Sequence, residues 1–221
     1  MLRHPSIPWV LPFVVFMLLL GILPALRLPV VADLALRVLL PALVLLIVSR
    51  RILDFRPVAP VRSVAVGVAV FVIWVAPDAL WPGYRHHWLF QNAFTGHLVS
   101  TLPEDAKNHA LSLVLRIIRA VIVVPVVEEL FWRGWLMRWS IHHDFESIPL
   151  GTFARSAFWI TAALFALEHG PYWEVGFLAG AVYNWWIVRT KRLGDMFLTH
   201  AVTNGCLAAY VLITGRWEYW M

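Results

Sequence analysis

The chain has 221 residues, of which 61% are hydrophobic and only 14% are charged. Soluble domains carry about a quarter charged residues, so this composition excludes an ordinary soluble domain and indicates a membrane protein. The formal net charge is +5, but the basic residues stand in short groups between apolar runs. That distribution is typical of topology signals and argues against a nucleic-acid partner.

Apolar runs recur along the whole chain. A membrane-spanning helix needs about 20 mainly apolar residues, and the candidates lie at Pro8–Leu26, Val30–Ser49, Ser63–Trp81, Ala110–Leu136, Ser156–His169, Trp173–Val188 and Gly194–Ile213. The fifth is short and is followed by Gly170-Pro171. We expect it to begin earlier, or to pack inside the bundle without reaching both surfaces.

These runs predict an all-α fold, a polytopic transmembrane helix bundle of about seven spans that encloses a polar cavity. No soluble segment divides the chain, so we expect a single integral membrane domain over residues 1–221. Residues 1–109 would hold the N-terminal spans and an external loop, and residues 110–214 would form the core that carries the motifs described below.

Basic residues in the short loops predict the orientation of the bundle. The loops after the second and sixth spans hold Arg50, Arg51, Arg56, Arg62, Arg189, Lys191 and Arg192. Positively charged loops stay in the cytoplasm. The N-terminus is therefore expected in the cytoplasm and the C-terminus outside.

The fourth span contains charged residues in the stretch "VVPVVEELFWRGWLMRW". Glu129 and Arg133 are four residues apart and share one helix face, so they can neutralise each other. Glu128 is rotated by about 100° from Glu129, which leaves it free to face a polar cavity. The alternative is that all three residues form one structural ion cluster.

Two further spans carry polar residues at helical spacing. In "FALEHG" of the fifth span, Phe165 and His169 share a face, although a lone histidine there could be a satisfied interfacial residue. Glu168 is expected to face solvent or to be structural. In "THAVTN" of the seventh span, His200 and Asn204 share a face and could donate two hydrogen bonds to one oxyanion.

Ionisable residues within spans are costly and indicate function. A carboxylate, two histidines and an amide on three spans could supply a general base, its partner and oxyanion donors. No serine or cysteine stands beside a histidine as a nucleophile would, so the attacking group is expected to be water. Gly176 and Gly180 on the sixth span would let two helices approach closely around such a site.

In chain order, the stretches "EELFWR", "FALEH" and "HAVTN" resemble the motif set of the type II CAAX prenyl endopeptidases. The wider family is the CAAX protease and bacteriocin-processing (CPBP, Abi) intramembrane proteases. All three stretches fall between about Val121 and Leu212. Together with the ending "ITGRWEYW", they also resemble the CAAX prenyl protease-related proteins that are associated with exosortase and exopolysaccharide systems in bacteria.

The resemblance implies a bundle of eight or fewer helices and a role for each motif residue. Glu128, with His169, would activate a water molecule for attack on the scissile carbonyl. His200 and Asn204 would stabilise the tetrahedral oxyanion. The remaining motif residues would be supporting: Glu129, Arg133 and Phe165.

Members of this family are often described as metalloproteases. Glu128, His169 and His200 could supply three ligands to a divalent metal such as zinc, with water as the fourth. The sequence lacks the HExxH helix typical of zinc proteases. We therefore favour a metal-free glutamate mechanism without a cofactor.

The sequence thus predicts an intramembrane endopeptidase of the bacterial inner membrane that cleaves a membrane-tethered protein or peptide. One alternative is a non-proteolytic scaffold or maturation partner in an exosortase or exopolysaccharide export system, with proteins of that system as partners. Another is a transporter or proton relay that uses the same buried groups. The lack of inverted repeats argues against the transporter.

Overall fold

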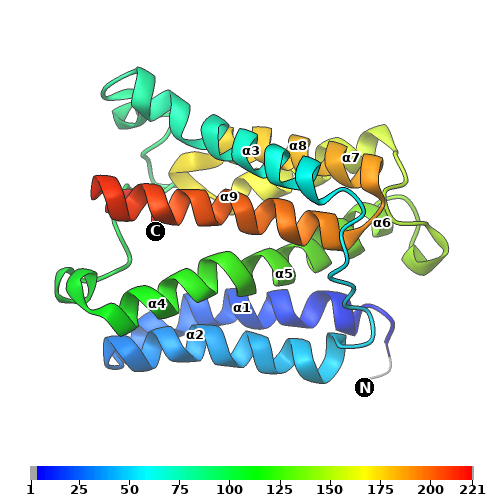
Figure 1. Cartoon of the computed structure of the whole chain (residues 1–221), viewed down its shortest axis with the longest axis horizontal. Coiled ribbons are helices and arrows are strands. Elements are labelled where there is room, and N and C mark those ends of the chain that lie inside the picture. The colour runs from blue at the N-terminus through cyan, green and yellow to red at the C-terminus, as the bar shows by residue number, and fades with distance from the viewer. Residues whose placement is uncertain (1–3, 221) are drawn as a thin grey trace.

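The computed structural model describes residues 4–220 as a bundle of helices (Figure 1). Residues 1–3 and 221 of the predicted domain lie outside the described residues. Between residues 4 and 220 there is no strand, and the one isolated bridge joins Asn92 to Gly96 in a loop. The predicted all-α class is confirmed.

The first half of the chain forms three long helices. These are α1 (Ile7–Leu26), α2 (Val30–Val44), which continues as the π-helical stretch η1 (Leu45–Ser49), and α3 (Pro60–Leu80). The connection from α3 to the fourth helix holds two short 3-10 helices, η2 (Tyr84–His86) and η3 (Glu104–Asn108).

The second half begins with one 30-residue helical segment, from Ala110 to Trp139. It consists of α4 (Ala110–Ile118), η4 (Arg119–Val123), α5 (Val124–Glu129), η5 (Leu130–Leu136) and α6 (Met137–Trp139), where η4 and η5 are π-helical. The remaining helices are α7 (Arg155–Leu167), α8 (Trp173–Thr190) and α9 (Leu193–Thr214). Single 3-10 turns lie at Phe145–Ser147, Gly170–Tyr172 and Trp217–Tyr219.

Five helical segments between residues 4 and 220 are long and apolar enough to cross a membrane. They are Ile7–Leu26, Val30–Ser49, Pro60–Leu80, Ala110–Trp139 and Leu193–Thr214. Helix α7 has 13 residues, or about 20 Å, which is shorter than the hydrocarbon core of about 30 Å. Helix α8 is not among the five because Glu174, Asn184 and Arg189 interrupt its apolar sequence. With these two, the segments agree with the predicted count of about seven.

The helices form two groups on either side of α5 (Figure 1). Helices α1, α2 and α4 pack together, while α9 packs against α3 and α5, and α7 packs against α8. The chain begins and ends at opposite ends of the bundle (Figure 1), as an odd number of crossings requires.

The two basic loops of the predicted orientation lie at the same end of the bundle. An ion pair of 3.6 Å joins Arg192 to Asp54, and Gly194 packs directly against the backbone of Arg56. Asp195 fastens this end further, because its carboxylate accepts hydrogen bonds from the N–H groups of Val58 and Ala59, both at 2.9 Å. The start of α9 is thereby fixed to the start of α3.

At the opposite end, Arg85 connects the loop after α3 to the turn between α7 and α8. Its guanidinium donates to the carboxylates of Asp78, at 2.8 Å, and Glu174, at 2.6 Å, and to the carbonyl of Pro171, at 2.8 Å. Burial lowers the pKa of Arg85, but the hydrogen bond to Asp78 and the negative charge of Glu174 outweigh it and raise the pKa overall. Arg85 therefore stays charged and holds the α7–α8 turn in place.

Candidate active site

The π-helical stretch η4 creates an unusual contact between the fourth segment and α9. Within η4 the N–H of Val124 donates to the carbonyl of Arg119, five residues earlier. The next bond of this series would run from Pro125 to the carbonyl of Ala120, but proline has no N–H. That carbonyl instead accepts a hydrogen bond of 2.8 Å from Nδ2 of Asn204. The side chain of Asn204 thus satisfies a backbone group that the membrane interior would leave unpaired.

Glu129 and Arg133 form the buried ion pair expected from their spacing. Oε1 of Glu129 lies 3.0 Å from Nη1 of Arg133, and both side chains have 0% exposure. The same oxygen lies 2.8 Å from Nδ1 of His200. Nε of Arg133 donates to Oδ1 of Asn184 at 3.0 Å. Hydrogen bonds of this kind are what make a buried ion pair tolerable. Through Oε1, Glu129 joins the fourth segment to α9 and, with Arg133, to α8, while its Oε2 has no hydrogen-bond partner among the described residues.

Glu128 is placed differently from its neighbour. It is 6% exposed and forms no hydrogen bond with any residue between 4 and 220. Its Oε2 lies 4.0 Å from Nε2 of His200, which is beyond hydrogen-bonding distance. The carboxylate lines a cavity of about 240 Å³. The rotation of about 100° between successive helical residues thus directs Glu129 into the protein and Glu128 into the cavity.

The end of α7 determines the orientation of His169. The N–H of His169 bonds to the carbonyl of Ala166, so the carbonyl of Phe165 lacks its usual α-helical donor. Nδ1 of His169 lies 2.6 Å from that carbonyl. A carbonyl can only accept, so Nδ1 carries the proton, and Nε2 of the neutral ring is left with a free lone pair.

Aromatic rings pack around the two histidines. The ring centroid of Phe165 lies 4.6 Å from that of His169 and 6.3 Å from that of His200. Tyr183 lies on another side of His200, with the ring centroids 5.0 Å apart. Cζ of Arg133 lies 4.5 Å from the Phe165 ring centroid, a cation–π distance. Phe165 therefore supports both imidazoles and the buried guanidinium at once.

The four residues expected to be catalytic converge on this one cavity. Its lining includes Glu128, His169, His200 and Asn204. No hydrogen bond joins Glu128 to His169 in the part of the chain that the structure describes. The supporting Phe165 also lines the cavity, whereas the Glu129–Arg133 pair lies behind it.

Several polar residues at the site were not predicted to belong to it, and one of them, Glu168, was expected to face solvent or to be structural. Glu168 lines the cavity and accepts a hydrogen bond of 3.0 Å from Nε1 of Trp132, so it faces the site and not bulk solvent. Tyr183 packs against His200, and Asn184 accepts a hydrogen bond from the supporting Arg133. Polar residues inside the otherwise apolar α8, and the position of Glu168 beside His169, were the signals in the sequence.

A metal centre requires several ligands that point to one spot. Within residues 4–220, no group of three or more His, Cys, Asp or Glu side chains is arranged to hold a metal ion. The set considered for zinc, Glu128, His169 and His200, is therefore not assembled as a ligand set in this arrangement. The metal-free mechanism stays a prediction.

The fold and the site together define a multi-pass helical membrane protein whose helices place acidic, imidazole and amide groups around one cavity. Residues 110–206 match the model of the family described as "Type II CAAX prenyl endopeptidase Rce1-like". The match covers less than half of the chain, and the matched segment contains every residue of the predicted site. No curated protein and no solved structure matches the chain, and the narrower likeness to exosortase-associated proteins stays an expectation.

Proposed function

We propose that the protein is an intramembrane endopeptidase that hydrolyses a peptide bond of a membrane-tethered substrate. The observation that carries the proposal is the carboxylate of Glu128. It has no hydrogen-bond partner among the described residues and faces a cavity shared with two histidines and an asparagine. A buried polar atom left without a partner calls for a functional explanation.

In the proposed reaction Glu128 acts as the general base. It takes a proton from a water molecule whose oxygen attacks the scissile carbonyl carbon, and it later returns that proton to the leaving amine nitrogen. His169 orients the water through the lone pair on Nε2, because its Nδ1 proton is held by the carbonyl of Phe165. The C–N bond breaks when the tetrahedral intermediate collapses.

His200 and Asn204 stabilise the oxyanion of that intermediate. Nδ2 of Asn204 has two N–H groups, and one of them is used by the carbonyl of Ala120, which leaves the second for the oxyanion. His200 presents Nε2 on the side of Glu128, and the carboxylate of Glu129 beside Nδ1 fixes the orientation of its ring. The metal-free reaction follows from these side chains alone.

The proposal is tested with the full chain in liposomes and membrane-tethered candidate substrates, and cleavage is read by terminal-peptide mass spectrometry. Glu128→Gln keeps the size of the side chain and removes the base, so it should reduce cleavage by about 10²-fold or more. Glu146→Gln, in an exposed loop, is the matched control and should cleave as wild type does. Equal cleavage by both variants would remove the mechanism.

We further propose that the protein lies in the bacterial inner membrane with its N-terminus in the cytoplasm and its C-terminus outside. The contact between the two basic loops supports this orientation, since a single face then collects the positive charge. A single cysteine placed at Arg51 or at Glu104, in a Cys206→Ala background, tests it. A membrane-impermeant thiol reagent applied to intact cells should label only the Glu104→Cys variant.

A further inference from the structure

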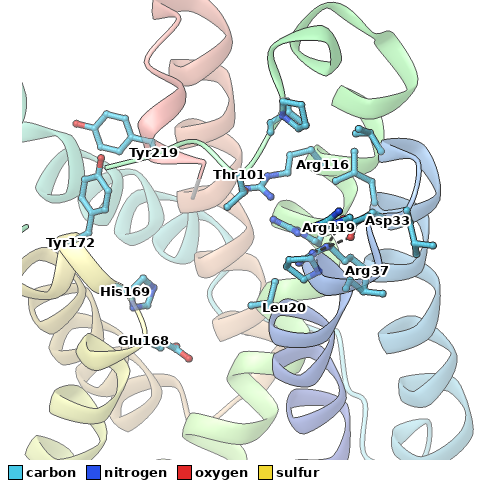
Figure 2. A pocket seen from close by; sticks show the side chains of 18 of the residues that line it. Leu20, Asp33, Arg37, Thr101, Arg116, Arg119, Glu168, His169, Tyr172 and Tyr219 are labelled. Atoms are coloured by element: carbon cyan, nitrogen blue, oxygen red, sulfur yellow. Dashed lines mark hydrogen bonds and ion pairs between the residues drawn. The ribbon is translucent and has the colours of Figure 1, made fainter. Parts of the chain in front are cut away.

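A second, larger cavity adjoins the candidate active site. Its volume is about 660 Å³, within the range of about 300–1,000 Å³ typical of ligand pockets. Trp74, Glu168 and His169 line both cavities. Figure 2 shows Arg116 and Arg119 on one wall of the larger cavity, with Glu168 and His169 on the wall opposite. A molecule in the larger cavity therefore reaches the histidine of the active site.

The larger cavity is rich in positive charge. Four arginines line it: Arg27, Arg37, Arg116 and Arg119. Only two carboxylates do so: Asp33 and Glu168. Asp33 is already occupied, because it accepts two hydrogen bonds from Arg37, at 2.6 and 3.1 Å.

Arg119 is the residue that points most clearly to a ligand. It lies in the fourth membrane-spanning segment and is 7% exposed. Its guanidinium, which is always charged, forms no hydrogen bond or ion pair with residues 4–220. An arginine held in a membrane span is costly and faces a cavity or a partner. The fork of donors on a guanidinium matches a carboxylate or a phosphate.

We propose that this arginine cavity binds the C-terminal carboxylate of the peptide substrate and so sets which bond lies at Glu128. The inference rests on the proposed function. Every peptide ends in a carboxylate, and the continuity of the two cavities places such an anchor in line with the catalytic groups. Leucines on the same walls, Leu20, Leu34 and Leu102, suit the apolar side chains of a substrate from the membrane.

The test compares two probes that differ only in the terminal group. They are an N-acetylated leucine–alanine–leucine peptide with a free carboxylate and the same peptide as its carboxamide. Binding to the full chain in neutral detergent is measured by tryptophan fluorescence in the Glu128→Gln background, where cleavage does not interfere. The acid should bind about tenfold tighter or more, as expected for charge-assisted hydrogen bonds. Equal binding of acid and amide, or binding of neither, overturns the proposal.

Substitution of Arg119 tests whether this residue binds the carboxylate. Arg119→Gln should abolish the preference for the acid, whereas Arg51→Gln, an exposed arginine at the other end of the bundle, should retain it. Arg119→Lys keeps the positive charge but lacks the planar fork of donors, so it should retain part of the preference for the acid. A partial preference in the lysine variant would show that the loss in Arg119→Gln does not come from misfolding. An unchanged preference in Arg119→Gln contradicts the assignment.

An anionic lipid headgroup could bind the arginines in the same way as the peptide carboxylate, because both are anionic oxygen groups. A further experiment distinguishes the two ligands. The protein is placed in nanodiscs of phosphatidylcholine with or without phosphatidylglycerol, and inorganic phosphate is added separately. Stabilisation by phosphatidylglycerol or phosphate that requires Arg119, together with equal binding of the two peptides, identifies a headgroup site and overturns the peptide proposal.

Cleavage of the two peptide forms distinguishes this inference from the proposed function. If cleavage requires Glu128 but Arg119→Gln leaves the acid-to-amide cleavage ratio unchanged, the arginine proposal fails and the peptidase stands. If binding of the acid requires Arg119 while no cleavage requires Glu128, the carboxylate site stands and the peptidase fails.

Discussion

Nδ1 of His200 lies 2.8 Å from Oε1 of Glu129, so the imidazole on α9 is oriented by the second of the two adjacent glutamates. Nε2 is the ring atom on the side of Glu128, at 4.0 Å. Glu129 also carries the ion pair to Arg133, and the two neighbouring carboxylates consequently have different tasks. Glu129 holds the side chains around the site in place, and Glu128 remains free to act in catalysis.

The buried ion pair of Glu129 and Arg133 predicts that single and double substitutions will change the stability non-additively. Glu129→Gln leaves the charge of Arg133 buried without its carboxylate, and we expect the free energy of unfolding to fall by about 3–5 kcal/mol. Arg133→Met should cost a similar amount, because it strands the carboxylate. In the double variant both charges are gone, so its loss of stability should be smaller than the sum of the single losses. Unfolding of the detergent-solubilised chain measures all three, and additive losses would contradict the coupling.

The same double variant separates stability from activity. Even where its stability recovers, the Nδ1 of His200 has lost its carboxylate partner, so cleavage should stay at least about tenfold below wild type. Recovery of cleavage along with stability would mean that Glu129 does not act through His200.

Asp195, at the start of α9 and outside the lining of the site cavity, predicts a loss of stability when it is substituted. Its carboxylate is 0% exposed and accepts from two backbone N–H groups and, at 2.7 Å, from Oγ of Ser63. Asp195→Ala strands these donors, and we expect a loss of about 1–3 kcal/mol or more in the free energy of unfolding. Asp105→Ala, at an exposed loop position, is the control. Thermal unfolding of both in detergent measures the difference, and equal midpoints would show that the Asp195 contacts do not fasten α9.

Local spacing was enough to predict much of the site. The positions of Glu129 and Arg133, one turn apart, indicated that they can form an ion pair, and apolar length located the long helices. The contacts of Asn204 and His200 across helices depend on tertiary packing, which spacing within one helix does not determine. The π-helical turn before Pro125, which brings Asn204 to the carbonyl of Ala120, has no periodic signature in the sequence. Arg119 was not singled out from the sequence, because its cavity exists only once α1, α2 and the α7–α8 turn are assembled.

The metal-free mechanism predicts resistance to chelators. No ligand set of three side chains assembles between residues 4 and 220, and the proposed steps use the protein side chains alone. We expect cleavage by the purified chain to persist after prolonged dialysis against EDTA and 1,10-phenanthroline. A zinc-dependent peptidase assayed in parallel verifies that the chelators act. Loss of cleavage that added zinc restores would show that Glu128 and the histidines act as metal ligands.

Close packing of Gly176 against His169 predicts that a small substitution on α8 disturbs catalysis. A Cβ atom at position 176 would lie 3.2 Å from Cβ and Cγ of His169 and 3.3 Å from its Nδ1. The imidazole would have to move, which would disturb the bond of its Nδ1 to the carbonyl of Phe165. Because small displacements of catalytic groups are expensive, we expect Gly176→Val to reduce cleavage by about tenfold or more and Gly176→Ala by less.

Gly21→Ala is the control, because it lies on α1 with no atom within 4 Å of the added Cβ. It should leave cleavage unchanged and raise the free energy of unfolding by about 0.5–1 kcal/mol. Wild-type turnover by Gly176→Val would show that the position of His169 does not limit the reaction.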